Sequence, residues 1–114
     1  MKEGLLWAML NIHYLCNVST FNSIKQLLQK VKPELAKKYH VKSIGLFGSI
    51  VRDDFSTAKS DVDIIVEFSQ PVGVEFIDLA DFLEFQIKRK VDLISRNGIK
   101  QNLYKEIERE IIYV

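Results

Sequence analysis

The stretch that decides the fold runs from residue 47 to residue 68 and reads FGSIVRDDFSTAKSDVDIIVEF. A glycine-serine turn, Gly48-Ser49, follows one apolar run, and two aspartates, Asp61 and Asp63, open the next. A Gly-Ser turn offers backbone N–H groups and a hydroxyl to phosphate oxygens. An Asp-x-Asp on a strand offers two carboxylates to a magnesium ion. The two motifs together predict an enzyme that acts on a nucleoside triphosphate.

The second half of this stretch alternates as a strand does. Because successive side chains of a strand point to opposite faces, Asp61 and Asp63 are expected to share one face. The other face carries apolar side chains, those of Val62, Ile64, Val66 and Phe68. Ile65 shares the aspartate face, so the strand beyond its first residues is expected to be buried on both faces. Burial on both faces is typical of a strand inside a sheet.

The composition fits one soluble domain. The chain has 114 residues, of which 47% are hydrophobic and 27% charged, with a formal net charge of +1, and this suits a single small core. Sixteen basic and fifteen acidic residues give no broad basic field, so stable nucleic-acid binding is not expected. The single cysteine, Cys16, has no internal disulfide partner, and the cytoplasm is the expected location.

Residues 1–19 differ from the rest and are interpreted as an N-terminal extension or accessory helix, with the main domain over residues 20–114. Asn11 and His13 interrupt the apolar run, which is shorter than the ~20 residues that a membrane span needs. No membrane partner is therefore expected. A cleaved signal peptide is the less favoured interpretation of this segment.

Periodicity and turn residues predict the remaining elements. Ser19 or Thr20 is placed to cap a helix that reaches Val31, and Pro33 is placed to begin a second, short helix over residues 34–39. Strands are expected over residues 41–47, 61–68 and 91–95. Helices are expected over residues 76–87 and 99–110, followed by an apolar tail over residues 111–114.

In these motifs the chain resembles the minimal nucleotidyltransferases of the DNA polymerase β superfamily. The likeness runs from about Ile24 to the end and includes the segments VKSIGLFGS, SDVDIIVEF, KVDLIS and EIEREIIYV. It implies an α/β fold, a small mixed sheet with helices chiefly on one face. Eleven residues separate Ser49 from Asp61, one more than the family's usual spacing, and a one-residue insertion costs little loop-closure entropy.

The resemblance implies the roles of individual side chains. Asp61 and Asp63 would bind two Mg²⁺ ions, and Asp92 would complete the metal site near the acceptor hydroxyl. The phosphates of ATP would be bound by Gly48, Ser49 and Arg52. Two ions about 3.5–4 Å apart can clamp the attacking and leaving oxygens of a displacement at phosphorus. Asp92 lies in an apolar strand, where a buried carboxylate is costly unless a metal or hydrogen bonds compensate.

The resemblance also implies a partner. Members of the family act as antitoxins to HEPN-type RNase toxins by transferring AMP from ATP to a toxin tyrosine. Since 114 residues leave no room for a second, acceptor-binding domain, the acceptor is expected to be a separate protein. Two alternatives stay open: a non-catalytic antitoxin that only binds its toxin, and a nucleotidyltransferase with a small-molecule or nucleic-acid acceptor.

Each motif taken alone has a simpler explanation. A lone Asp-x-Asp is more often part of a turn or cap than of a metal site. Asp92 alone could be a charge that protects an edge strand from aggregation. Phe76, Phe82 and Phe85 are interpreted as core side chains rather than as a platform for a base. The order of the motifs along the chain favours the enzyme.

Overall fold

The sheet is built from four strands. The structure is a computed structural model that describes residues 12–51 and 61–114, with side chains from residue 20 onward. The strands are β1 (Val41–Phe47), β2 (Val62–Phe68), β3 (Val91–Ser95) and β4 (Ile112–Tyr113), and they lie side by side in the order β3-β2-β1-β4. β2 runs antiparallel to β1 and parallel to β3, and β4 runs antiparallel to β1. The predicted mixed α/β sheet is therefore confirmed.

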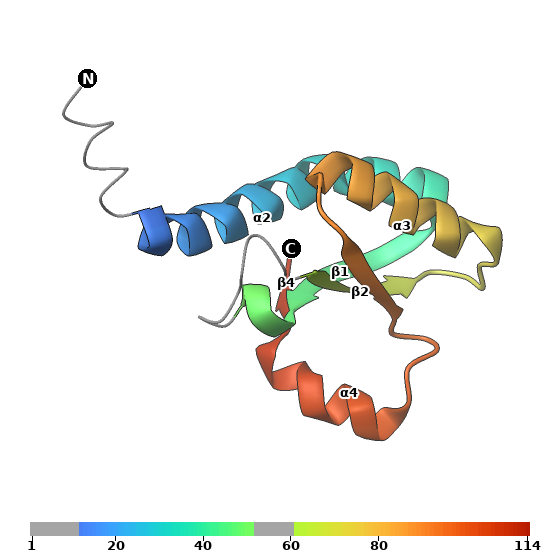
Figure 1. Ribbon diagram of the computed structural model, residues 1–114. Helices are drawn as coiled ribbons and strands as arrows, with labels where there is room; N and C mark the ends of the chain where they lie inside the picture. The colour runs from blue at the N-terminus through green and yellow to red at the C-terminus, as the bar shows by residue number, and fades with distance from the viewer. Residues whose placement is uncertain (1–11, 52–60) are drawn as a thin grey trace.

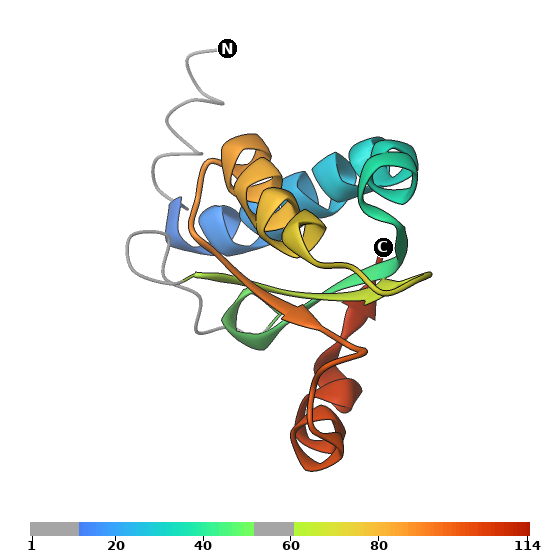
Figure 2. The ribbon, with the colours of Figure 1, turned by 90° about the vertical axis from the view of Figure 1, so that its right-hand side faces the viewer.

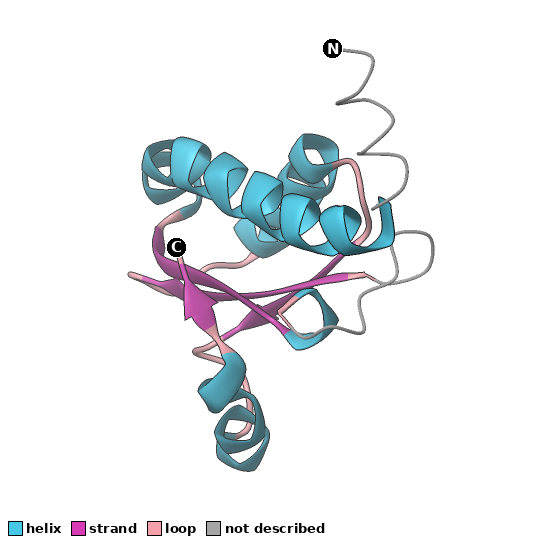
Figure 3. Cartoon of the chain, turned by 90° about the vertical axis from the view of Figure 1, so that its left-hand side faces the viewer, coloured by secondary structure: helices cyan, strands magenta, loops and turns pink. Residues whose placement is uncertain are grey.

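Two of the helices cover one face of this sheet. They are α2 (Ile12–Tyr39) and α3 (Val74–Ile87), whereas α4 (Gln101–Ile107) lies on the opposite side (Figure 1, Figure 2). Figure 3 shows the same layers from the other side of the molecule. The prediction of helices chiefly on one face is thus confirmed. None of the helices in the described part of the chain is long and apolar enough to cross a membrane.

The core fills the space between the sheet and the α2–α3 layer. Val62, Ile64 and Val66 of β2 are fully buried there, as the alternation along the strand predicts. The two helices contribute the buried side chains of Ile24, Leu28, Val31, Leu35, Leu79, Leu83 and Ile87. Burial of each such side chain stabilises the fold by about 1.5–3 kcal/mol. Ile65 is buried on the other face, and β2 lies inside the sheet as expected.

The N-terminal helical region is one helix rather than two. Pro33 lies inside α2, and Ser19 and Thr20 also lie within it rather than at its start. An interior proline removes a backbone hydrogen bond and costs roughly 3 kcal/mol. Val31 and Leu35 flank it and are buried against the sheet, so their burial offsets that cost. The boundary expected at residues 19/20 falls within this helix, and the division of the chain there remains a prediction.

The last helix is shorter than predicted. The last helix, α4, ends at Ile107, and a 3₁₀ turn over Glu108–Glu110 follows it. The apolar tail forms β4 along β1. The Val114 N–H donates to the Ile44 carbonyl oxygen at 3.0 Å, and Lys32 Nζ donates to the Val114 carbonyl oxygen at 2.7 Å. The tail therefore forms one edge strand of the sheet and is hydrogen-bonded to α2.

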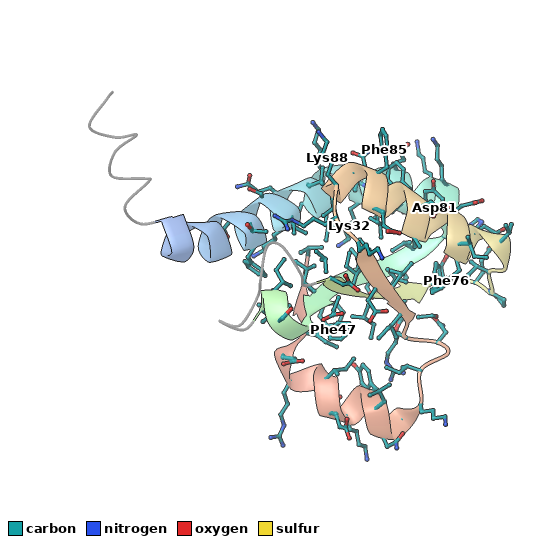
Figure 4. All side chains as sticks on the ribbon, viewed as in Figure 1. Lys32, Phe47, Phe76, Asp81, Phe85 and Lys88 are labelled. Atoms are coloured by element: carbon teal, nitrogen blue, oxygen red, sulfur yellow. The ribbon has the colours of Figure 1, made fainter. Side chains whose placement is uncertain are left out.

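The interpretation of all three phenylalanines of α3 as core residues is wrong for one of them. Phe76 and Phe82 are partly buried against the core, but Phe85 is 78% exposed and points away from the sheet (Figure 4). Phe85 lies two residues from both Leu83 and Ile87, and a separation of two residues places a side chain on the opposite side of a helix.

Candidate active site

The Gly-Ser turn begins directly where β1 ends. Gly48–Ile50 forms a 3₁₀ turn, which is closed by a hydrogen bond from the Val51 N–H to the Gly48 carbonyl oxygen at 3.0 Å. Gly48 has a φ of 77°, in the left-handed region that glycine adopts without steric cost. Gly48 is buried and Ser49 is half-buried. The Ser49 hydroxyl and the backbone of the turn thus stand at one end of the sheet.

Asp63 packs directly against this turn. Its Cα pairs with that of Phe47 across the antiparallel β1–β2 ladder. A Cβ atom added to Gly48 would overlap Asp63 Oδ2 and would lie 3.0 Å from Asp63 Cγ. The carboxylate therefore occupies the space that a side chain at position 48 would fill. The two halves of the sequence motif form one structural unit.

Asp92 lies next to Asp63 on the neighbouring strand. In the parallel β2–β3 ladder the Cα atoms of Asp63 and Asp92 are partners, so both side chains belong to the same face of the sheet. The Val62 N–H donates to the Lys90 carbonyl oxygen at 2.9 Å and holds this register. The register brings together two carboxylates that are far apart in the sequence.

The expectation that Asp92 bears a burial cost is wrong. Asp92 is exposed, whereas Asp63 is half-buried. β3 is the edge strand of the sheet, so water reaches the Asp92 carboxylate and no compensating partner is required. What supports a role for Asp92 is its register with Asp63 rather than its surroundings.

The structure does not gather the three aspartates into one cluster. Asp61 is exposed and precedes Val62, the first residue of β2, so no strand pairing fixes its position. Within residues 12–51 and 61–114, no group of three or more His, Cys, Asp or Glu side chains is close enough to hold a metal ion. Arg52 lies outside the described residues. The roles of these side chains remain predictions.

A cavity lies at the other end of the strands. It has a volume of about 470 Å³ and is lined by Phe68, Ser69, Gln70, Pro71, Val72, Ser95, Asn97 and Gly98. Asn97 Oδ1 accepts a hydrogen bond from the Phe68 N–H at 3.0 Å. Asp63 and Asp92 lie near the starts of β2 and β3, so the cavity is separated from them by the length of these strands.

Sequence reasoning missed a second group of side chains on the aspartate side of the sheet. The Arg96 guanidinium carbon lies 3.7 Å from the centroid of the Tyr104 ring, and Tyr113 forms a hydrogen bond with Tyr104. Arg96 lies in the turn directly after β3, where strand alternation no longer assigns a face. Tyr104 of α4 and Tyr113 of β4 come close to Arg96 only in the folded chain, so no sequence pattern indicated them.

Comparison with known proteins identifies the family. Residues 28–114 match the family model for a nucleotidyltransferase domain. The protein MJ0126 of Methanocaldococcus jannaschii, whose name describes it provisionally as a protein adenylyltransferase, is 41% identical over 100 residues, which cover 85% of this chain and 100% of that protein. Protein adenylyltransferase MntA of Thermococcus cleftensis is 38% identical over 96 residues, which cover 83% of this chain and 96% of that one.

A solved structure has the same fold. In the complex of a tri-AMPylated Shewanella oneidensis HEPN toxin with its MNT antitoxin, the matched chain superposes with a TM-score of 0.55 at 21% identity, covering 85% of this chain and 70% of that one. At this identity the likeness concerns the fold alone. The matches over most of the chain, together with the geometry of the turn and the aspartates, show that this chain belongs to the nucleotidyltransferase domain family.

Proposed function

We propose that this chain is a Mg²⁺-dependent protein adenylyltransferase that transfers AMP from ATP to a hydroxyl group, expected to be that of a tyrosine, on a cognate HEPN-type toxin, and so acts as an antitoxin. The observation that carries this proposal is the contact of Asp63 with Gly48 and its register with Asp92. Relatives named as protein adenylyltransferases support the choice of reaction. The AMPylated toxin bound to a structurally similar antitoxin supports the choice of acceptor.

The placement of the groups supports a displacement at the α-phosphorus of ATP. The acceptor hydroxyl oxygen would attack the α-phosphorus of ATP, the bond from that phosphorus to the oxygen of the β-phosphate would break, and pyrophosphate would leave. The hydroxyl proton has to be removed as the new bond forms. Asp92 is exposed on an edge strand, where an incoming protein can reach it, and its carboxylate is suited to accept that proton.

The donor set fits magnesium. Mg²⁺ prefers oxygen ligands and is usually held by one or two carboxylates together with substrate phosphates. Asp63 and Asp92 supply two carboxylates on neighbouring strands, and we propose that Asp61 adds a third. Bound Mg²⁺ would neutralise charge that builds up on the leaving pyrophosphate. ATP and Mg²⁺ are both abundant in the cytoplasm, where we propose that the protein acts.

Ser49→Ala should weaken the binding of ATP. If the Ser49 hydroxyl donates to a phosphate oxygen, its loss removes a hydrogen bond to a charged group, which contributes about 1.5–3 kcal/mol, or roughly 10- to 150-fold in KM or Kd for ATP. Ser43→Ala is the matched control, because Ser43 is also half-buried and lies on β1 away from the turn. An equal KM for wild type and Ser49→Ala would mean that the triphosphate binds elsewhere. Arg52→Ala should raise the KM for ATP in the same way as Ser49→Ala.

The proposal is tested with the protein pair. The chain is incubated with the HEPN-type protein encoded beside it, ATP and Mg²⁺, and the toxin is examined by mass spectrometry and by an RNase assay. We expect one or more AMP units on a toxin tyrosine and loss of RNase activity. Toxin suppression without any added mass would instead identify an antitoxin that acts by binding. Transfer of AMP to another acceptor only would contradict the proposed partner.

A further inference from the structure

Three side chains on the aspartate side of the sheet form what we call the Arg-Tyr cluster: Arg96, Tyr104 and Tyr113. The Arg96 guanidinium lies over the Tyr104 ring at 3.7 Å. Tyr113 is 52% exposed, and the partial burial of its side chain and a hydrogen bond with Tyr104 raise its pKa.

The cluster lies within reach of the candidate active site. Arg96 follows Asp92 by four residues, which corresponds to about 13 Å along a strand. Its N–H donates to the Val66 carbonyl oxygen at 2.7 Å, so the chain at Arg96 still follows β2. Arg96 directly follows β3, and its contact with Tyr104 of α4 places its side chain on the α4 side of the sheet, which is the aspartate side (Figure 2).

Tyr113 approaches from the other edge of the sheet. It pairs with Gly45, and a Cβ atom added to Gly45 would lie 3.2 Å from Tyr113 Cδ1. The tyrosine ring therefore lies over the Gly45 backbone. Gly45 in turn pairs with Ile65, two residues after Asp63. Along the strands, Tyr113 thus lies level with a residue two positions, or about 7 Å, beyond Asp63, and Arg96 lies about 13 Å beyond Asp92.

The chemistry of the cluster suits a nucleotide. Purine bases stack on tyrosine rings and on arginine guanidinium planes. We propose that the Arg-Tyr cluster is a binding subsite for an adenosine monophosphate group whose phosphate end points toward Asp63 and Asp92.

This AMP group has two possible sources. The existence of the subsite does not depend on the proposed function, but the choice between the two sources rests on it. It is either part of the ATP that reacts or an AMP unit that an earlier transfer has joined to the acceptor. In the first case the cluster sets the affinity for ATP. In the second case it holds the growing product and determines how many AMP units are added.

The test uses the full chain and free AMP as the probe. Arg96→Ala should weaken AMP binding, measured by calorimetry or by NMR titration, at least about fivefold, the loss expected when one base-stacking partner is removed. Arg96→Lys keeps the charge but loses the planar stack, so it should weaken binding as well. Arg109→Ala is the matched control, since Arg109 is exposed in the turn after α4, and it should bind AMP as wild type does.

The KM for ATP and the number of AMP units per acceptor distinguish the two sources of the AMP group. If the Arg96→Lys variant has a higher KM for ATP than the wild type in the first transfer to the acceptor, the bound group is the AMP part of ATP. An unchanged KM with fewer AMP units per acceptor, counted by mass spectrometry, identifies the joined AMP. Wild-type AMP binding by both folded Arg96 variants, or no AMP binding by the wild type, would overturn the subsite. Arg96-dependent AMP binding without any transfer would uphold the subsite and contradict the proposed function.

Discussion

Asp63→Asn should lower the rate of AMP transfer at least about 100-fold, because a metal-binding carboxylate contributes several kcal/mol to stabilising a transition state at phosphorus. Asparagine has nearly the shape of aspartate and can keep the contact with Gly48. The inward side chains next to it, Val62 and Ile64, are untouched. We therefore expect the fold and the melting temperature to stay close to those of the wild type.

The matched control for this variant is Asp81→Asn. Asp81 is an exposed carboxylate of α3, in the helix layer on the other face of the sheet (Figure 4). Circular dichroism and a labelled-ATP transfer assay are run on both variants, and Mn²⁺ binding is followed by paramagnetic resonance as a readout independent of activity. Unchanged transfer by a folded Asp63→Asn protein would refute the metal assignment. Asp61→Asn and Asp92→Asn are measured in the same way, and the losses of transfer rate and Mn²⁺ binding show how much each of the three carboxylates contributes.

The periodicity of β2 could be predicted because it follows from local rules. Alternation alone assigned Val62, Ile64 and Val66 to the core and placed Asp63 on the opposite face. The order of the motifs along the chain also predicted that Gly48 and Asp63 belong to one site, and the structure places the two residues in contact. The two motifs lie next to each other because β1 and β2 pair as neighbouring antiparallel strands.

Other features depend on tertiary contacts that no local pattern contains. The register of Asp92 with Asp63 depends on how α3 returns the chain to the sheet, and the edge position of β3 left Asp92 exposed. Pro33 could not be placed from propensity, since propensity favours a helix start and packing of the whole helix overrides it. Phe85, in contrast, could have been placed from the sequence, because it lies two residues from both Leu83 and Ile87 and therefore on the opposite side of the helix.

Gly48→Ala should destabilise the protein and remove transfer activity. A left-handed conformation costs an alanine about 1–2 kcal/mol, and Gly48 has a φ of 77°. The new Cβ would also displace the Asp63 carboxylate, which occupies the same space. Gly98→Ala is the matched control, because a Cβ at Gly98 meets nothing within 4 Å. Gly48→Ala should have a lower free energy of unfolding in denaturant and no transfer activity, whereas Gly98→Ala should resemble the wild type in both measurements.

A double-mutant cycle then isolates the contact between the turn and the aspartate. Gly48→Ala is made in the wild type and in Asp63→Ala, which lacks the carboxylate that the new methyl group would meet. If the overlap contributes, the loss of unfolding free energy caused by Gly48→Ala should be smaller in the Asp63→Ala background, where mainly the backbone strain remains. Equal losses in both backgrounds would show that backbone conformation alone requires the glycine. In that case the packing of the Asp63 carboxylate would not depend on position 48, and the turn and the aspartate would be energetically independent.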